Sequence, residues 1–189
     1  MPTINAIRLV DIEYDSGQKV IGDTLLLPKN RNALFHLANG GGKTLLIQLI
    51  LQTLLPNETL NKRRISDLVA HKNYTGHIAI EWKLDSVEEY LLTGFCFTGG
   101  DEESEQLKYF SYLNQYSQDP EFGIASFPYV DDGKVISYNE LLRLLKKKPE
   151  RFMLFSGDGK RNSYVNALKT YGLFEKEWKQ IKTTNNSEG

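Results

Sequence analysis

Apolar and polar residues alternate over short stretches in the first hundred residues of the chain, a pattern typical of half-buried strands. The alternation predicts strands at residues 4–14 and 20–27, with a turn at residues 15–17 between them. Two more strands are predicted at residues 77–84 and 89–97. Because only a few residues separate these two, we expect them to pair as an antiparallel hairpin.

The second half of the chain combines strand patterns with helical ones. Ser137 and Glu140 have the spacing of a capping box, in which each side chain bonds a free amide of the first helical turn. Lysines gather at the end of the same segment, where they complement the helix dipole, and Pro149 ends it. The elements predicted here are strands at residues 106–113 and 124–130, a turn at 131–133, and helices at 138–148, 162–171 and 174–181.

Between the two groups of strands lies a segment of a different kind. Residues 33–37 are short and mostly apolar, which predicts a buried strand. Residues 43–55 predict a helix with apolar side chains on nearly every side, and such a helix must be buried. This order of strand, glycine-rich loop, buried helix and antiparallel strands indicates an α/β fold or mixed α+β layers.

The glycine-rich loop has the chemistry of a phosphate site. Gly40, Gly41 and Gly42 let consecutive backbone N–H groups turn toward phosphate oxygens, and the helix that follows adds the positive end of its dipole. Lys43 is placed to bridge the β- and γ-phosphates, and the Thr44 hydroxyl to bind Mg²⁺. The sequence therefore predicts ATP and Mg²⁺ as ligands, although Leu37 stands where the full motif has its first glycine.

Composition narrows the class of protein without identifying it. The chain has 189 residues, 40% hydrophobic and 25% charged, as in an ordinary globular domain. It has no run of about 18 apolar residues and no signal-peptide pattern at its start, so neither a membrane span nor export is expected. Cys96 stands alone, which excludes an internal disulfide, and a cytoplasmic location is expected. The net charge of −1 gives no overall attraction to nucleic acid.

The loop and its surroundings resemble those of a known ATPase class. Ala38-Asn39-Gly40-Gly41-Gly42-Lys43-Thr44 is similar to the Pro-Asn-Gly-x-Gly-Lys-Ser loop of SMC, RecF and MukB-type ATPases, whose heads are of the ABC type. Residues 64–69 resemble the basic stretch that follows the loop helix in SMC proteins. The predicted strands resemble the antiparallel lobe of such heads, and residues 172–189 resemble their junction into a coiled coil.

The resemblance carries expectations about fold, ligands and partners. It implies a P-loop NTPase fold: residues 1–182 as the N-terminal lobe of an ABC-type head, with a mixed or antiparallel sheet around a buried helix, and residues 183–189 as a polar tail. Its partners would be a C-terminal lobe in cis or in trans, a second head, and DNA bound by the assembled complex in chromosome maintenance, DNA repair or defence. The residues expected to contact nucleotide are Asn39, Gly40, Gly41, Gly42, Lys43, Thr44, Leu45, Arg63 and Arg64, with Thr44 also holding the metal.

Elements that hydrolysis requires in this class are missing from the chain. No apolar stretch ends in the Asp-Glu pair that holds Mg²⁺ and polarises the attacking water, and no Leu-Ser-Gly-Gly signature occurs. The turn after the first predicted strand, Tyr14-Asp15-Ser16-Gly17, also lacks the cation that such heads place there. Hydrolysis is therefore expected only when a C-terminal lobe completes the site.

Two other interpretations remain open from the sequence. A stand-alone kinase or GTPase would need a second acidic strand or a base-reading Asn-Lys-x-Asp, and neither occurs. A non-catalytic interaction module with a vestigial loop is the other, and Leu37 in place of glycine motivates it. Lys62-Arg63-Arg64 is equally compatible with an arginine loop near nucleotide and with a solvated basic turn.

Overall fold

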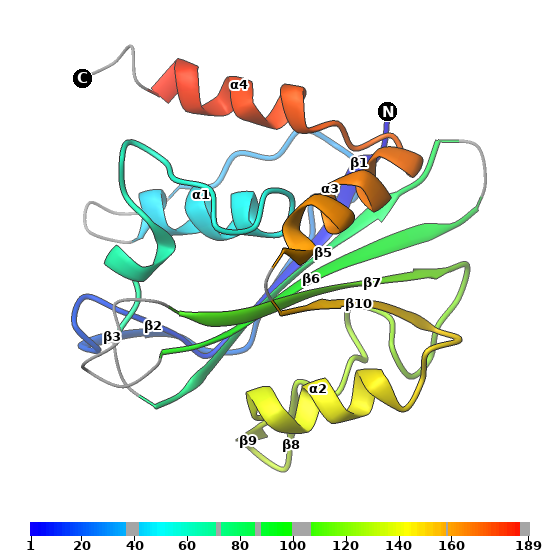
Figure 1. The fold of residues 1–189 in the computed structure, drawn as a ribbon, viewed down its shortest axis with the longest axis horizontal. Coiled ribbons are helices and arrows are strands. Elements are labelled where there is room, and N and C mark those ends of the chain that lie inside the picture. The colour runs from blue at the N-terminus through cyan, green and yellow to red at the C-terminus, as the bar shows by residue number, and fades with distance from the viewer. Residues whose placement is uncertain (37–41, 71–72, 86–87, 100–106, 158, 186–189) are drawn as a thin grey trace.

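Alternating apolar residues build one antiparallel sheet at the centre of the protein (Figure 1). The computed structural model describes residues 1–36, 42–70, 73–85, 88–99, 107–157 and 159–185. Six strands in this part form the sheet in the order β10-β7-β6-β5-β1-β4, and each neighbouring pair is antiparallel. The strands are β1 (Thr3–Val10), β4 (Thr24–Leu26), β5 (Thr75–Lys83), β6 (Tyr90–Thr98), β7 (Lys108–Tyr116) and β10 (Phe152–Ser156).

Four α-helices and two small ladders surround the sheet in the described part of the chain. The helices are α1 (Lys43–Gln52), α2 (Tyr138–Lys146), α3 (Lys160–Thr170) and α4 (Glu175–Asn185), with a short 3-10 turn η1 (Ile65–Asp67). The ladders are β2 (Ile12–Tyr14) with β3 (Lys19–Ile21), and β8 (Val130–Asp131) with β9 (Lys134–Val135). The mixed α/β class predicted from the sequence is confirmed, with the antiparallel sheet as its dominant feature.

Each face of the sheet has its own core because side chains alternate along the strands. On one face, Ile7, Ile80 and Phe95 pack with Leu49 of α1 and Leu168 of α3. On the same face, α4 contributes Trp178, whose ring meets Trp82 edge-on at 5.5 Å between centroids. The opposite face carries α2 and the segment of residues 122–129, which pack on Ala79, Cys96 and Tyr112. Figure 1 shows α1, α3 and α4 on one side of the sheet and α2 alone on the other.

Several local predictions agree with the structure. The hairpin of β5 and β6 lies within two residues of its predicted bounds, while β7 overlaps the strand predicted at residues 106–113 and ends three residues later; residue 106 lies outside the described residues. The capping box is formed: the Ser137 hydroxyl accepts the Glu140 N–H, and the Glu140 carboxylate accepts the Ser137 N–H at 2.9 Å. The turn between the first two predicted strands is also confirmed, with Asp15, Ser16 and Gly17 all at positive φ.

Other boundaries differ from the prediction. The first predicted strand is divided into β1 and β2 by Asp11, whose φ of 52 interrupts the extended backbone. The second predicted strand is likewise divided, into β3 and β4. Residues 124–129 form turns and bends instead of a strand, and the carbonyls of Ile124, Ala125 and Phe127 accept hydrogen bonds from the Arg8 side chain. Helix α4 continues to Asn185, into the segment expected to be a polar tail.

The predicted buried strand before the glycine loop is wrong for the residues that the structure describes. Residues 33–36 have no strand conformation and are exposed, with Leu34 97% and Phe35 41% accessible. Leu37, the last residue of that prediction, lies outside the described residues. The helix after the loop is found, but it ends at Gln52, and Ile47 is 38% exposed, so one side of it faces solvent. An apolar strand needs a neighbour to satisfy its backbone, and residues 33–36 pair with none in the described chain.

Candidate functional site

Helix α1 begins with a backbone geometry suited to an anion. Its N-cap is Gly42 at φ 84 and ψ 23, in the left-handed region that glycine occupies without strain. No side chain caps this end, and the first turn carries no acidic residue. Lys43 and Thr44 are both exposed there. Asn39, Gly40 and Gly41, the rest of the predicted loop, lie outside the described residues.

The backbone at this end presents donors outward. The first α-helical hydrogen bond runs from the Leu46 N–H to the Gly42 carbonyl at 2.8 Å, so the amides of Lys43, Thr44 and Leu45 precede it. These amides and the helix dipole make a favourable position for negative charge. The Leu45 side chain is buried in the core, and only its backbone is placed to contact a ligand.

The rest of α1 is fixed by contacts that hold its first turn in place. Leu45 and Leu49 pack into the core below the helix. Near its other end, the Gln48 and Gln52 side chains donate to the Glu58 carbonyl at 2.8 and 3.0 Å. The exposed first turn therefore stands on a well-packed base, as a preorganised binding site requires.

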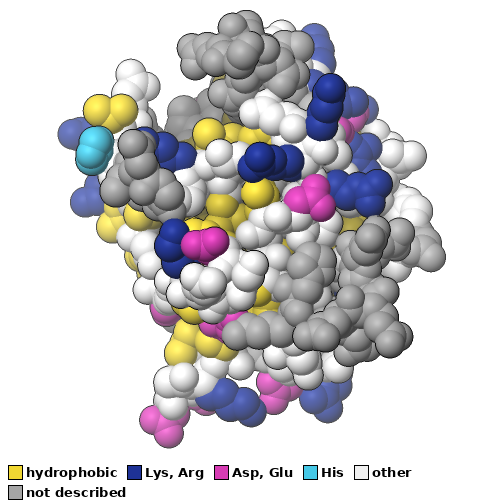
Figure 2. Space-filling model, turned by 90° about the vertical axis from the view of Figure 1, so that its left-hand side faces the viewer, with side chains coloured by type: hydrophobic (Ala, Val, Ile, Leu, Met, Phe, Trp, Pro, Cys, Tyr) yellow, Lys and Arg dark blue, Asp and Glu magenta, His cyan; other side chains and the backbone are white. Residues whose placement is uncertain are grey.

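The β2–β3 hairpin lies beside the start of α1, which no local sequence signal indicated. A Cβ atom on Gly42 would be 3.6 Å from the ring of Tyr14 in β2. The start of α1 and this hairpin share the left-hand side of Figure 1. Figure 2 looks at that side, where Lys and Arg side chains and apolar side chains both reach the surface. The approach joins residues that are 28 positions apart, so only the tertiary structure reveals it.

Arg63 and Arg64, also predicted to contact nucleotide, lie in a tight turn next to η1. Asn61 and Lys62 have φ values of 51 and 63, and Leu60 and Arg63 exchange two backbone hydrogen bonds around them. This is the two-residue turn whose twist matches a short hairpin. Both arginines are exposed, and η1, which follows them, contacts α1. The two arginines are therefore exposed at a turn, and a nucleotide role for them stays a prediction.

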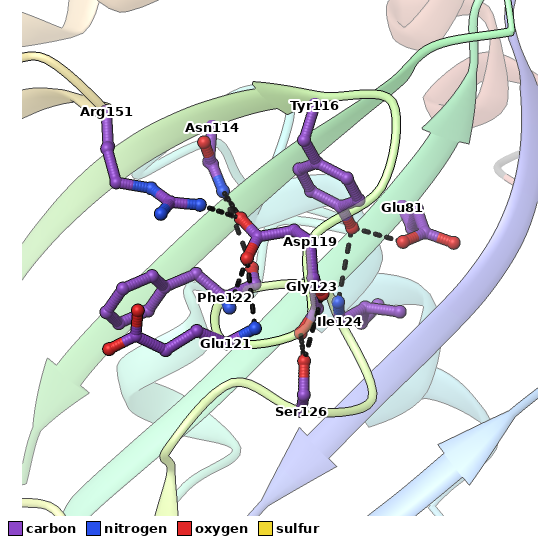
Figure 3. A network of polar contacts seen from close by, with 10 residues as sticks. All are labelled: Glu81, Asn114, Tyr116, Asp119, Glu121, Phe122, Gly123, Ile124, Ser126 and Arg151. Atoms are coloured by element: carbon purple, nitrogen blue, oxygen red, sulfur yellow. Dashed lines mark hydrogen bonds and ion pairs between the residues drawn. The ribbon is translucent and has the colours of Figure 1, made fainter.

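A second polar cluster, on the opposite face of the sheet, has a structural role (Figure 3). The buried Asp119 carboxylate accepts the Phe122 and Glu121 N–H groups at 2.7 and 3.1 Å, and also bonds Arg151 and Asn114. Burial alone would raise the pKa of Asp119, yet the hydrogen bonds from these amides and from Arg151 hold that pKa below its usual range. The carboxylate thus ties down the turn that follows β7.

Other polar side chains of this cluster also have hydrogen-bond partners within the protein. Glu81 accepts hydrogen bonds from Asn5 at 2.6 Å and from the Tyr116 hydroxyl, which itself accepts the Ile124 N–H at 3.1 Å. Burial and the adjacent Glu81 raise the pKa of Tyr116 far above its ordinary value. The polar groups of Figure 3 serve the packing of residues 119–126, and the start of α1 remains the better candidate site.

The buried His77 should make the stability of the protein depend on pH. It is 1% exposed, its Nε2 lies 2.9 Å from the Ile136 carbonyl, and its Nδ1 has no hydrogen-bond partner in the described chain. Burial lowers the pKa of His77 to about 4. The unfolded chain takes up this proton near pH 6.5 and the folded one resists it, so the free energy of unfolding should fall by about 3 kcal/mol from pH 7 to pH 4.

Urea titrations across that pH range measure this effect. Gln can donate the same hydrogen bond to Ile136 but does not titrate, so His77→Gln should lose much of the pH dependence between pH 6.5 and pH 4. Equal slopes for the wild type and His77→Gln would show that His77 is not the group responsible.

The described residues include no metal-binding cluster and no helix that could span a membrane. Among them, no group of three or more His, Cys, Asp and Glu side chains is arranged to hold a metal ion. His36 is exposed and His77 is buried, while His71 lies outside the described residues. None of the helices that the structure describes has the length and apolar character to cross a membrane.

No protein-family model matches this chain, and no curated protein matches it.

Proposed function

We propose that this chain binds Mg·ATP at the start of α1 and acts as the N-terminal lobe of an SMC-like, DNA-associated ATPase head. The observation that carries the proposal is the geometry at Gly42: a left-handed glycine opens a helix whose first turn exposes a lysine and a threonine and contains no acid. That combination suits a polyphosphate and the Mg²⁺ that accompanies it.

Each residue at this helix start has a distinct role in the proposal. The Lys43 ammonium would bridge the β- and γ-phosphate oxygens. The Thr44 hydroxyl would be one ligand of Mg²⁺. The backbone amides at the helix start would hold the phosphate nearest the helix. Bound Mg²⁺ supplies charge neutralisation of the triphosphate.

The exposed segment before the loop supports the requirement for a second lobe. Leu34 and Phe35 are apolar and exposed, next to the residues expected to bind phosphate. In a P-loop fold this position belongs to a buried strand, and a strand is stable only beside another strand. A C-terminal lobe that supplies this neighbour would also supply the carboxylates for hydrolysis. We therefore expect nucleotide binding by this chain and turnover only by the completed head.

Calorimetry with Mg·ATP tests the site directly. The wild type should bind with micromolar affinity, and Lys43→Ala should weaken binding about 100-fold, because a charge-assisted contact to phosphate is worth up to about 3 kcal/mol. Lys160→Ala is a matched control: Gly159 opens α3 in the same left-handed conformation, at φ 77, and an exposed lysine follows it. This control should bind like the wild type.

Three results would count against the proposal in different ways. Wild-type binding that is unchanged in Lys43→Ala would show that the loop is vestigial. Equal losses in Lys43→Ala and Lys160→Ala would indicate nonspecific attraction of the anion. Turnover of ATP or GTP by the purified chain alone would favour a stand-alone enzyme over one lobe of a head.

A further inference from the structure

The β2–β3 hairpin carries a lysine to the neighbourhood of the phosphate site. Tyr14 and Lys19 are direct partners in the register of this hairpin. The Lys19 Nζ lies 5.9 Å from the centroid of the Tyr14 ring. A Cβ atom added to Gly42, at the start of α1, would lie 3.6 Å from the same ring. One aromatic ring therefore separates the Lys19 ammonium from the backbone that is expected to hold phosphate.

Contacts with two parts of the fold hold Tyr14 in place. Its backbone forms a bridge with Val69 on the side away from β3, and the neighbouring Glu13 carbonyl accepts the Ala70 N–H at 2.8 Å. Its ring is half-buried against the core that includes α1. The ring is thus held between two parts of the fold, and Lys19 is directed by the ring and by the hairpin register.

Lys19 has an ion-pair partner that a stronger anion can replace. Its Nζ lies 2.9 Å from the Asp15 carboxylate, and both side chains are about half exposed. Hydrogen bonding to Asp15 raises the pKa of Lys19, so the side chain stays protonated. Exposed ion pairs contribute little to stability, so exchanging this carboxylate for a triphosphate with several negative charges costs little.

We propose that Lys19 is a second phosphate-binding cation of the site, exchanging Asp15 for the triphosphate when nucleotide binds. Tyr14 is the positioning residue that holds Lys19 beside Gly42. The inference rests on the proposed nucleotide site at α1. The turn at residues 15–17 contains no cation in the sequence. Lys19 lies two positions after this turn and reaches back over Tyr14, so the inference assigns the missing cation to Lys19.

Calorimetry with two probes, inorganic tripolyphosphate with Mg²⁺ and Mg·ATP, tests the assignment. Lys19→Ala should weaken both about tenfold, as loss of one charge-assisted contact does. Asp15→Asn should tighten both about threefold, since it removes the competing carboxylate. Asn is well suited to that position, because Asp15 has φ 55 and Asn tolerates the left-handed region. Lys134→Ala is the control, in another exposed lysine–carboxylate pair near α2 on the opposite face of the sheet.

The possible results separate this inference from the proposed function. If Lys43→Ala loses affinity while Lys19→Ala binds within twofold of the wild type, the role of Lys19 is overturned and the proposed site remains intact. Weaker ATP binding with unchanged tripolyphosphate binding in Lys19→Ala would place Lys19 at the base and overturn the phosphate assignment. Tighter binding in Asp15→Asn together with weaker binding in Lys19→Ala supports it. No binding of either probe by the folded wild type would remove both proposals.

Discussion

Replacing Gly94 with alanine is expected to lower the free energy of unfolding by about 3 kcal/mol, and the melting temperature by about 10 °C. Gly94 in β6 pairs directly with Tyr112 in β7, and the Tyr112 ring lies across the glycine. A Cβ atom at Gly94 would come closer than 3.0 Å to three atoms of that ring. The substitution therefore forces the ring out of its place.

The ring of Tyr112 has nowhere to move. Its side chain is fully buried, its hydroxyl bonds that of Tyr129, and its ring lies 5.9 Å from that of Phe127. Interiors packed at this density do not absorb an added methyl group without strain. Displacing Tyr112 also breaks its hydrogen bond and leaves a buried hydroxyl unsatisfied.

Thermal and urea unfolding of three glycine variants measure this effect. Gly76→Ala should behave like Gly94→Ala, because the Phe97 ring covers Gly76 in the same way. Gly22→Ala is the matched control, since a Cβ there meets nothing within 4 Å, and its change should stay within about 0.5 kcal/mol. A Gly94→Ala protein as stable as the Gly22→Ala protein would contradict the placement of the Tyr112 ring.

Replacing Arg8 with alanine is expected to cost about 4 kcal/mol of unfolding free energy. Arg8 in β1 is only 7% exposed. Its guanidinium makes two hydrogen bonds of 2.9 Å to Asp23, and the pairing lowers the pKa of that carboxyl. It also donates to the carbonyls of Ile124, Ala125 and Phe127, at 2.9 to 3.1 Å. Alanine would take this donor from all three carbonyls, and of the three that of Phe127 keeps a hydrogen bond from the Tyr129 N–H, at 2.8 Å.

Arg8→Ala should loosen residues 119–129 in addition to lowering the free energy of unfolding of the whole protein. Urea unfolding measures the total, and limited proteolysis should show earlier cleavage within residues 119–129 in Arg8→Ala. Arg8→Lys should recover only part of the stability, because an ammonium cannot reproduce the fork of five donors. Lys179→Ala, which removes an exposed pair with Glu175, is the control and should change stability by less than about 0.5 kcal/mol. A cost below about 1 kcal/mol for Arg8→Ala would show that other contacts hold this segment.

The elements predicted correctly from sequence are those whose signals are local. The β5–β6 hairpin joins strands that follow one another, so alternation within each strand and a short connection suffice. Helix α2 carries its start signal in Ser137 and Glu140, three residues apart. At the candidate site, Gly42, Lys43 and Thr44 are adjacent, and the expected helix begins directly at Lys43.

The errors occur where distant residues decide the conformation. Residues 124–129 are apolar enough for a strand, but three of their carbonyls bond Arg8, more than 110 positions earlier in the chain, and the segment forms turns and bends. Residues 33–36 have a strand-like composition, yet nothing in the described chain pairs with them. Composition reports the tendency to be buried, whereas a ladder requires a neighbour at hydrogen-bonding distance.

The sequence by itself determined the α/β class, the main hairpin, the capped helix α2, and the glycine, lysine and threonine that begin α1. These features depend on spacing along the chain, which sets periodicity, capping and backbone freedom. Only the tertiary structure decided that Tyr14 lies against Gly42, that Lys19 lies over Tyr14, and that Arg8 holds a distant turn. The contacts of Tyr14 with Gly42 and of Arg8 with residues 124–127 join segments far apart in sequence, and the packing of the whole sheet brings them together. That of Lys19 with Tyr14 depends on the register of the β2–β3 hairpin.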